Sequence, residues 1–178
     1  MVERGVRSSE VNLTPFSVKL HECTTSLSLI RASGKNMSGI PLHFQPSVES
    51  VRGYADDTVR LMKQQYNFDL SDYRASRLET VDFVMNQWKA GGANVNQVGK
   101  SMYAFGAYAG EVLRNTEPGR WFKPEGTESP DDFFDYPFLA VRLLDGRVWK
   151  PINLAFHFMA SQGPADFHNS LKAFLESN

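Results

Sequence analysis

The sequence predicts an α+β domain, and three observations lead to this fold class. Apolar residues recur at helical spacing in three successive stretches between Ser47 and Asn115. Two short apolar runs then flank Asp145-Gly146, a dipeptide typical of a β-hairpin turn. An amphipathic stretch follows Pro164. This order indicates three successive helices, a small antiparallel sheet with a hairpin at Asp145-Gly146, and a C-terminal helix.

The first 36 residues differ in composition from the rest of the chain. They are rich in Ser and Thr, and their apolar residues are scattered. Such a terminal stretch is commonly loose unless contacts tie it down. We therefore expect residues 1–36 to be an N-terminal extension and residues 37–178 to form a single α+β domain, which is an ordinary length for one domain.

The first two helices have recognisable ends. Ser47 is placed to cap a helix that ends near Tyr66-Asn67. Ser76, followed three residues later by Glu79, has the capping-box pattern and begins a second helix that ends at Gly91-Gly92. Asp82 lies among the apolar residues of this second helix, and we expect it at the edge of the apolar stripe rather than in a site.

The third helix is the one around which we expect the other elements to pack. Asn94 and Gln97 form a second capping-box pattern at its start. Its apolar stripe is matched on the opposite side by small residues that include Gly106 and Gly110. Each glycine inside a helix costs about 1 kcal/mol relative to alanine, so we expect another part of the backbone to approach there and the helix to be covered on two sides.

Glu111 is the only formal charge between Lys100 and Arg114. If the small-residue side is covered, a carboxylate there needs a partner, because an unpaired buried charge is costly. Arg114, one turn further on, and Arg120 are the candidates. A structural ion pair and a functional carboxylate in a pocket both fit this pattern.

The strand region follows the third helix. Trp121-Phe122 is placed to begin a short strand, and a two-residue hairpin loop at 145–146 would set Arg142 opposite Trp149, where the two side chains could stack. Residues 152–162 are apolar and fit either a strand or a helix. Pro164 and Asp166 then open the closing helix.

Composition argues against several classes of partner. The net charge is −1 and no run of Lys and Arg is present, so neither nucleic acid nor a membrane surface is an expected partner. No apolar run approaches the roughly 20 residues of a membrane helix. Cys23 is the single cysteine, which rules out an intrachain disulfide and favours a reducing, cytoplasmic location.

Several motifs fail as metal or cofactor sites, and we expect neither. Gly99-Lys100-Ser101 has no leading glycine at position 94 and no strand before it, as a phosphate-binding loop requires. His21 and Cys23 have no second pair of ligands nearby for zinc. The acids at 131, 132 and 135 lack the alternating order of a calcium loop.

One polar cluster remains as a candidate site. Tyr108, Glu111 and Arg114 are spaced three apart, so they follow one flank of the third helix. Trp121 follows this helix, and His157 is a possible neighbour. The cluster could hold a small polar ligand between the indole and the Glu/Arg pair, or it could pin the end of the helix against the hairpin.

The run from Phe105 to Leu113, with Trp121 and the strand-turn-strand after it, resembles a family of bacterial domains of unknown function. These domains share a helix with a Gly-x-Tyr-x-Gly-Glu pattern, an Asp-bearing helix upstream and a Trp strand downstream. The resemblance covers about residues 45–176. It implies a fold, and it carries no activity.

We expect a non-enzymatic protein-interaction or accessory module, of the immunity type. No catalytic constellation withstands inspection, and aromatic residues are enriched at contact surfaces. The candidate interaction loop carries Asp132, Phe133, Phe134 and Tyr136. The alternative is an enzyme or small-ligand binder that uses Glu111 as acid, base or anchor, with Arg114 and Tyr108 holding the substrate.

Overall fold

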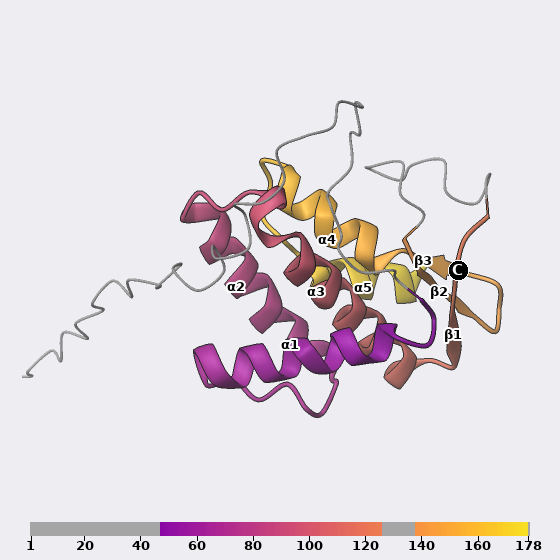
Figure 1. Ribbon diagram of the computed structural model, residues 1–178. Helices are drawn as coiled ribbons and strands as arrows, with labels where there is room; N and C mark the ends of the chain where they lie inside the picture. Colours follow the sequence, from indigo (N-terminus) through magenta and orange to yellow (C-terminus); the bar gives the residue numbers. More distant parts are fainter. Residues whose placement is uncertain (1–46, 126–137, 178) are drawn as a thin grey trace, which may run out of the picture. The chain divides into compact units, whose positions relative to one another are not determined.

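The structure, a computed structural model, describes residues 47–125 and 138–177. Across these ranges the chain forms five α-helices, one short 3-10 helix and three strands (Figure 1): α1 Val51–Tyr66, η2 Ala75–Arg77, α2 Leu78–Ala90, α3 Val95–Thr116, β1 Gly119–Phe122, β2 Ala140–Leu143, β3 Val148–Trp149, α4 Pro151–Ala160 and α5 Phe167–Glu176. The predicted α+β fold, with three successive helices, a small antiparallel sheet and a C-terminal helix, is confirmed.

Two predictions lie outside the described residues. The proposed extension, residues 1–36, is one of them. The proposed interaction loop with Asp132, Phe133, Phe134 and Tyr136 is the other, and it belongs to the connection between β1 and β2. Both stay predictions.

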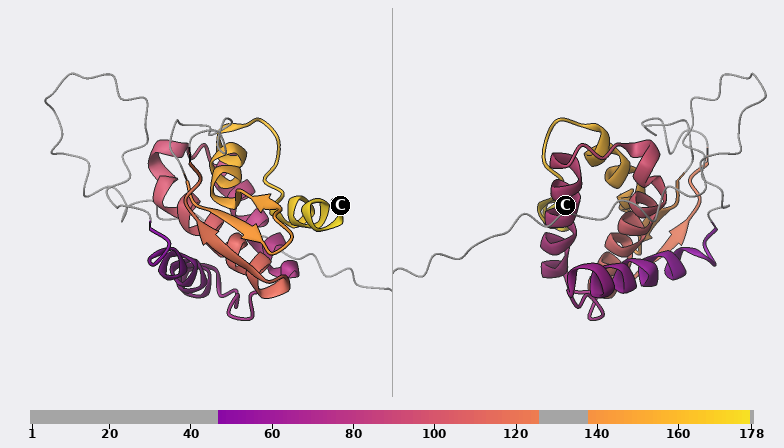
Figure 2. Two further views of the ribbon diagram at one scale, coloured as in Figure 1. Left: turned by 90° about the vertical axis from the view of Figure 1, so that its right-hand side faces the viewer. Right: turned by 60° about the vertical axis from the view of Figure 1, so that its left-hand side comes forward.

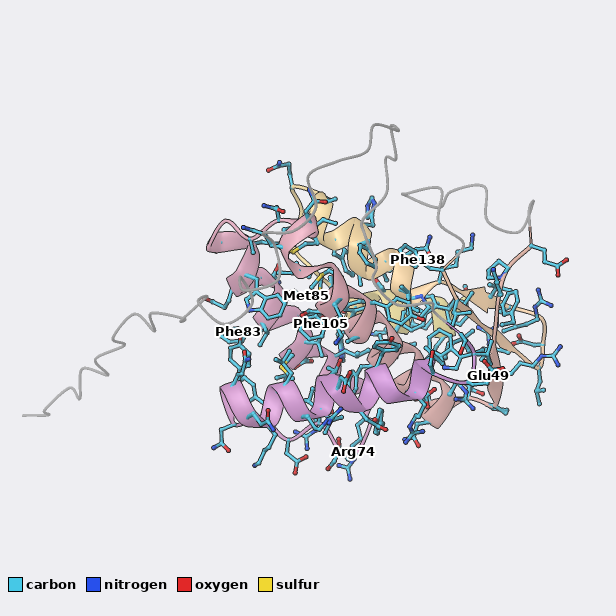
Figure 3. All side chains as sticks on the ribbon, in the orientation of Figure 1. Glu49, Arg74, Phe83, Met85, Phe105 and Phe138 are labelled. Atoms are coloured by element: carbon cyan, nitrogen blue, oxygen red, sulfur yellow. The ribbon has the colours of Figure 1, made fainter. Side chains whose placement is uncertain are left out.

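Helix α3 is the centre of the described fold. Every residue from Met102 to Leu113 is buried. Helix α1 packs along one side of α3 and α4 along another, as Figures 1 and 2 show. Figure 3 marks Phe105 of α3 and Phe138, which are almost fully buried, and Phe83 of α2, whose side chain lies at the surface. The expectation that protein covers α3 on two sides is therefore met.

The two glycines of α3 mark where its neighbours come closest. A Cβ added at Gly106 would lie 2.8 Å from the carbonyl oxygen of Pro151 and 2.9 Å from the amide nitrogen of Ile152. At Gly110 an added Cβ would overlap the indole ring of Trp121. The first turn of α4 packs on the bare backbone at Gly106, and the indole packs on that at Gly110, so the cost of two glycines in the helix is offset by close packing.

The sheet has the order β1-β2-β3 and is antiparallel throughout. The hairpin lies where Asp145-Gly146 predicts it, but the register differs by one residue, because Arg142 pairs with Val148 instead of Trp149. Leu143 N–H donates to the Arg147 carbonyl, which makes the loop three residues long, and Gly146 has the left-handed φ of 92° that ends such loops.

This shift in register changes the aromatic contacts. The Arg142 guanidinium lies 4.0 Å from the centre of the Phe122 ring, so the predicted stacking of Arg142 on Trp149 is wrong. Trp149 points inward, and its ring stacks on Phe174 of α5 with centroids 6.0 Å apart. One face of the sheet thus packs on the helices, and the other carries Arg142 and Phe122.

Some predicted helix ends are correct and others are displaced. The capping box at Asn94 and Gln97 forms as predicted. The box predicted from Ser76 does not, since Ser76 lies within η2 and no side chain caps α2. Helix α1 begins at Val51 after a turn in which the Ser50 N–H donates to the Ser47 hydroxyl. The ambiguous segment 152–162 is mostly helical and supplies α4.

Helix α5 is held at both ends by side chains from other elements. At its start, the Asp82 carboxylate accepts hydrogen bonds from the backbone N–H groups of Phe167, at 2.7 Å, and His168, at 3.1 Å. At its end, the Arg147 guanidinium donates to the carbonyls of Phe174 and Ser177, both at 2.9 Å. A negative group at the N-terminus and a positive group at the C-terminus both stabilise a helix.

Candidate functional site

The carboxylate of Glu111 is buried, and both of its oxygens accept hydrogen bonds. Its Oε1 accepts hydrogen bonds from Arg114 Nη1 and Trp121 Nε1, both at 2.6 Å, and its Oε2 accepts one from Arg52 Nη1 at 2.8 Å. Only 2% of the Glu111 side chain is exposed, against 36% for Arg114 and 58% for Arg52. Two arginines therefore neutralise the carboxylate from the solvent side, and the indole N–H donates a further hydrogen bond to it from the protein interior.

The local sequence explains how three of these groups meet. Arg114 lies one turn after Glu111 on α3, which brings both side chains to one flank. The chain then returns as β1, and Trp121 on that strand lies over Gly110. Because residue 110 has no side chain, the indole can come close enough for its N–H to reach the neighbouring carboxylate.

Arg52 is the member of the site that sequence reasoning missed. It comes from the first turn of α1 and is 59 residues from Glu111 in sequence. Arg52 also lies 3.7 Å from Asp56 and 4.9 Å from the centre of the Tyr73 ring, and the Tyr73 hydroxyl donates to Asp56. No local pattern separates Arg52 from the other charged residues of α1, so only the packing of α1 on α3 reveals it.

Tyr108 is close to Glu111 in sequence but makes contacts with other residues. Its hydroxyl donates to the Leu70 carbonyl at 3.0 Å, and its ring stacks on Tyr73 with centroids 5.1 Å apart. Burial raises the pKa of Tyr108, so the phenol remains protonated and keeps this hydrogen bond. Tyr108 thus fixes the segment between α1 and α2 and touches the Glu111 network only through Tyr73.

His157 is the predicted member that the structure places elsewhere. It lies on the exposed side of α4, whereas Glu111 is sealed inside. Of the five predicted residues, Glu111, Arg114 and Trp121 come together directly. Arg120, the other predicted partner of Glu111, is exposed on β1, and Arg52 occupies that role.

The geometry of Glu111 fits a structural role better than a catalytic one. A general base must come within reach of a substrate proton. The Glu111 side chain is only 2% exposed, and each of its oxygens already accepts a hydrogen bond from an arginine or the indole. The contacts join α1, α3 and β1 at one point. This arrangement supports the structural ion-pair interpretation.

Asp82 is more deeply placed than its sequence position indicates. It was expected at the edge of the apolar stripe of α2, yet it is 8% exposed and binds the first turn of α5. Burial raises the pKa of the Asp82 carboxyl to about 6, although the two backbone N–H groups favour its charged form. Its partners follow it by about 85 residues, so no local signal could have shown this role.

The described chain forms neither a phosphate-binding loop at residues 99–101 nor a metal-binding cluster. Residues 99–101 are helical and belong to α3, so they do not form the loop that cradles a phosphate. Within residues 47–125 and 138–177, no three His, Cys, Asp or Glu side chains gather as a metal site requires. None of the helices described is both long and apolar enough to cross a membrane.

Comparison with known proteins adds no relative. No family model matches the chain, and neither the curated proteins nor the solved structures contain a match. The function is therefore argued from the geometry alone.

Proposed function

We propose that this chain is a non-enzymatic protein-binding module, of the accessory or immunity type, and that its contact surface is the outer face of the sheet. This sheet face consists of Arg120, Phe122, Arg142 and Val148, with Leu144 at the hairpin turn. Figure 2 (left) shows the sheet in front of the helices of the described fold. The opposite face, with Trp121, Val141 and Trp149, supplies the core contacts.

The observation that carries the proposal is the exposure of apolar side chains on this face. Leu144 is 84% exposed, the most of any large hydrophobic residue in the described ranges, and Val148 is 36% exposed. Val148 pairs with Arg142 near the end of β2, and Leu144 follows β2 in the hairpin turn. Both exposed apolar side chains therefore lie at the hairpin end of the sheet.

The composition of the sheet face also fits a protein partner. The guanidinium carbon of Arg142 lies over the Phe122 ring, 4.0 Å from its centroid, in a cation–π contact that holds a long side chain in place. Arginine and aromatic residues are the types most enriched at interface centres. Phe133, Phe134 and Tyr136 of the candidate interaction loop lie between β1 and β2 in sequence, and the proposal includes them as contact residues.

The proposal also includes a cellular compartment and a relationship to a family of bacterial domains. The single Cys23 supports a reducing, cytoplasmic compartment. The Gly-x-Tyr-x-Gly-Glu pattern supports kinship with the bacterial domains it resembles, and in this chain each of its four residues makes a packing contact or a buried hydrogen bond. Residues that make such contacts maintain the fold, so domains that share the pattern would share a scaffold and differ at their surfaces.

The alternative, an enzyme or ligand binder that works through Glu111, has weaker support. It needs an opening to the carboxylate, but Glu111 is 3% exposed. The variant Glu111→Gln separates the two proposals, because a binding module would keep its partner as long as the fold persists.

The test is affinity capture from the native cell with matched surface variants. The wild-type chain is compared with Leu144→Asp/Val148→Asp on the sheet face, Phe133→Ser in the loop, and Phe83→Asp as a control. Phe83 is 53% exposed on α2, away from the sheet, so it matches the apolar-to-charged change at another surface.

We expect one partner to be captured by the wild type, Phe83→Asp and Glu111→Gln, and to be lost with the sheet-face variant and with Phe133→Ser. Circular dichroism and urea unfolding of each variant establish that the fold persists. Capture that survives both the sheet-face variant and Phe133→Ser, or that is lost equally with Phe83→Asp, would contradict the proposal.

A further inference from the structure

A groove between α1 and α3 lies apart from both surfaces described above. It has a volume of about 340 Å³ and is lined by Asp57, Thr58, Arg60, Leu61, Gln64, Lys100, Ser101 and Ala104. Ala104 is seven residues before Glu111 on α3, which corresponds to about 10 Å along a helix. The volume falls at the lower end of the range for small-molecule sites.

The groove exists because α3 presents small side chains to α1 at this point. Nearer the start of α1, the rings of Tyr54 and Tyr103 fill the space between the helices in an edge-to-face contact at 4.9 Å. Further along α1, about two turns after Tyr54, Ser101 and Ala104 are too short to reach Leu61 and Gln64 in the same way. The packing therefore opens toward solvent between these four residues.

The walls combine an apolar floor with hydroxyl and amide groups. Leu61 and Ala104 supply the apolar surface. Ser101 and Gln64 supply donors and acceptors at the sides, while the Thr58 hydroxyl already donates to the Tyr54 carbonyl at 3.4 Å. Apolar walls with a few polar groups are the usual composition of small-molecule sites.

Among the charged residues that line the groove, one cation has no ion-pair partner in the described ranges. Arg60 and Asp57 form an ion pair with each other. Lys100 is exposed at the rim, and none of the ion pairs of the described ranges includes it. With two basic residues and one acidic residue in the lining, the groove has a net charge of +1, carried by the Lys100 ammonium.

We propose that this groove binds a small monoanionic organic molecule, with its anionic group on Lys100 and its apolar body on Leu61 and Ala104. The single surplus cation matches one negative charge. The apolar floor requires a ligand with a carbon body, so an inorganic anion would satisfy only the rim. This site goes beyond the proposed protein-binding function and uses none of the residues of the sheet face.

The test is an NMR titration of the full chain, followed by backbone amide shifts, with three probes. The first probe, 2-naphthoate, has both the charge and the apolar body. The second, 2-naphthamide, has the same shape without the charge, and the third, acetate, has the charge without the body. We expect saturable shifts with 2-naphthoate in the millimolar range, confined to residues 57–64 and 100–104, and affinity at least about tenfold weaker for each of the other two.

Two lysine variants test whether Lys100 binds the anionic group. Lys100→Gln should weaken 2-naphthoate binding about tenfold, while Lys172→Gln, an equal charge change on the exposed side of α5, should leave it unchanged. The proposal is overturned by the absence of saturable shifts in the groove, by equal binding of 2-naphthamide, or by equal effects of the two lysine variants. The comparison of probes needs no variant, so it decides the question even if a substituted chain misfolds.

Discussion

The indole N–H of Trp121 donates a 2.6 Å hydrogen bond to the carboxylate of Glu111, and the same indole ring packs on the bare backbone of Gly110. One residue pair therefore joins β1 to the central helix by both a buried polar contact and an apolar one. Arg114 and Arg52 complete the site by binding the same carboxylate from its exposed side. This arrangement makes the contribution of Glu111 to stability measurable.

Glu111→Gln should destabilise the fold by about 1–3 kcal/mol, because an amide cannot accept hydrogen bonds from both arginines and the indole as a carboxylate does. The loss stays below that of a fully buried pair, since Arg52 and Arg114 can turn toward water. Urea unfolding measures the change. Glu117→Gln, the same change at an exposed position beyond α3, is the control and should alter stability by less than about 0.5 kcal/mol; equal effects of the two variants would rule out a special role for Glu111.

The two glycines Gly106 and Gly53 should respond in opposite ways to alanine. At Gly106 the new methyl group meets the backbone of Pro151 and Ile152 on α4, which cannot move aside without shifting the helix, so Gly106→Ala should cost about 1–3 kcal/mol. At Gly53, on α1, nothing lies within 4 Å, and alanine should stabilise the fold by up to about 1 kcal/mol. Thermal unfolding of both variants checks the sign; a neutral or stabilising Gly106→Ala would mean that α4 does not pack as described.

Local patterns predicted the parts of the fold that depend on neighbours in sequence. The capping box at Asn94, the small side chains at Gly106 and Gly110, and the pairing of Glu111 with Arg114 each involve residues within one or two turns. The positions of the helices and the location of the hairpin follow from the same kind of information.

Contacts between distant segments could not be predicted in this way. Arg52 reaches Glu111, and Asp82 reaches the start of α5, only because helices far apart in sequence pack together. The hairpin register depends on whether Gly146 ends a loop of two or three residues, and the Asp-Gly dipeptide is compatible with both. One extra loop residue was enough to move Arg142 from Trp149 to Phe122.

Lys89, a half-buried residue at the end of α2, should hold the end of α4 in place. Its ammonium donates to the carbonyls of Phe158 at 2.5 Å, Ser161 at 2.9 Å and Gly163, which form the end of α4 and the turn after it. Lys89→Met keeps most of the aliphatic stem but leaves these acceptors without their cation, and should cost about 1–3 kcal/mol.

Chemical denaturation of Lys89→Met beside Lys172→Met tests this expectation. Lys172 is exposed on α5, and its replacement should change stability by less than about 0.5 kcal/mol. Amide hydrogen exchange adds a local readout, because faster exchange in α4 is expected only for Lys89→Met. Equal exchange in the two variants would show that the lysine contact does not hold the end of α4.

Asp82 should make the stability of the fold depend on pH between about 4 and 6. Burial raises the pKa of its carboxyl from 3.8 to about 6, so in this interval the folded chain holds a proton that the unfolded chain has released. The free energy of unfolding therefore falls as pH rises from 4 to 6, by about 2–3 kcal/mol at most, because one pKa unit corresponds to about 1.4 kcal/mol. From about one pH unit above this pKa, both states are ionised and this contribution is constant.

The pH dependence is isolated by comparing the wild type with Asp82→Asn in urea at pH 4.5, 5.5, 6.5 and 7.5. The difference in unfolding free energy between the two should shrink as pH rises, since the variant carries no proton to lose at this position. Asp69→Asn is the contrast: hydrogen bonds from Ser71 lower the pKa of Asp69, so its contribution is lost only below about pH 4 and should not vary over this range. The opposite result would be a difference in unfolding free energy between the wild type and Asp82→Asn that stays level or grows with pH. It would mean that the carboxylate is ionised in the folded chain throughout this range, stabilised by the N–H groups at the start of α5.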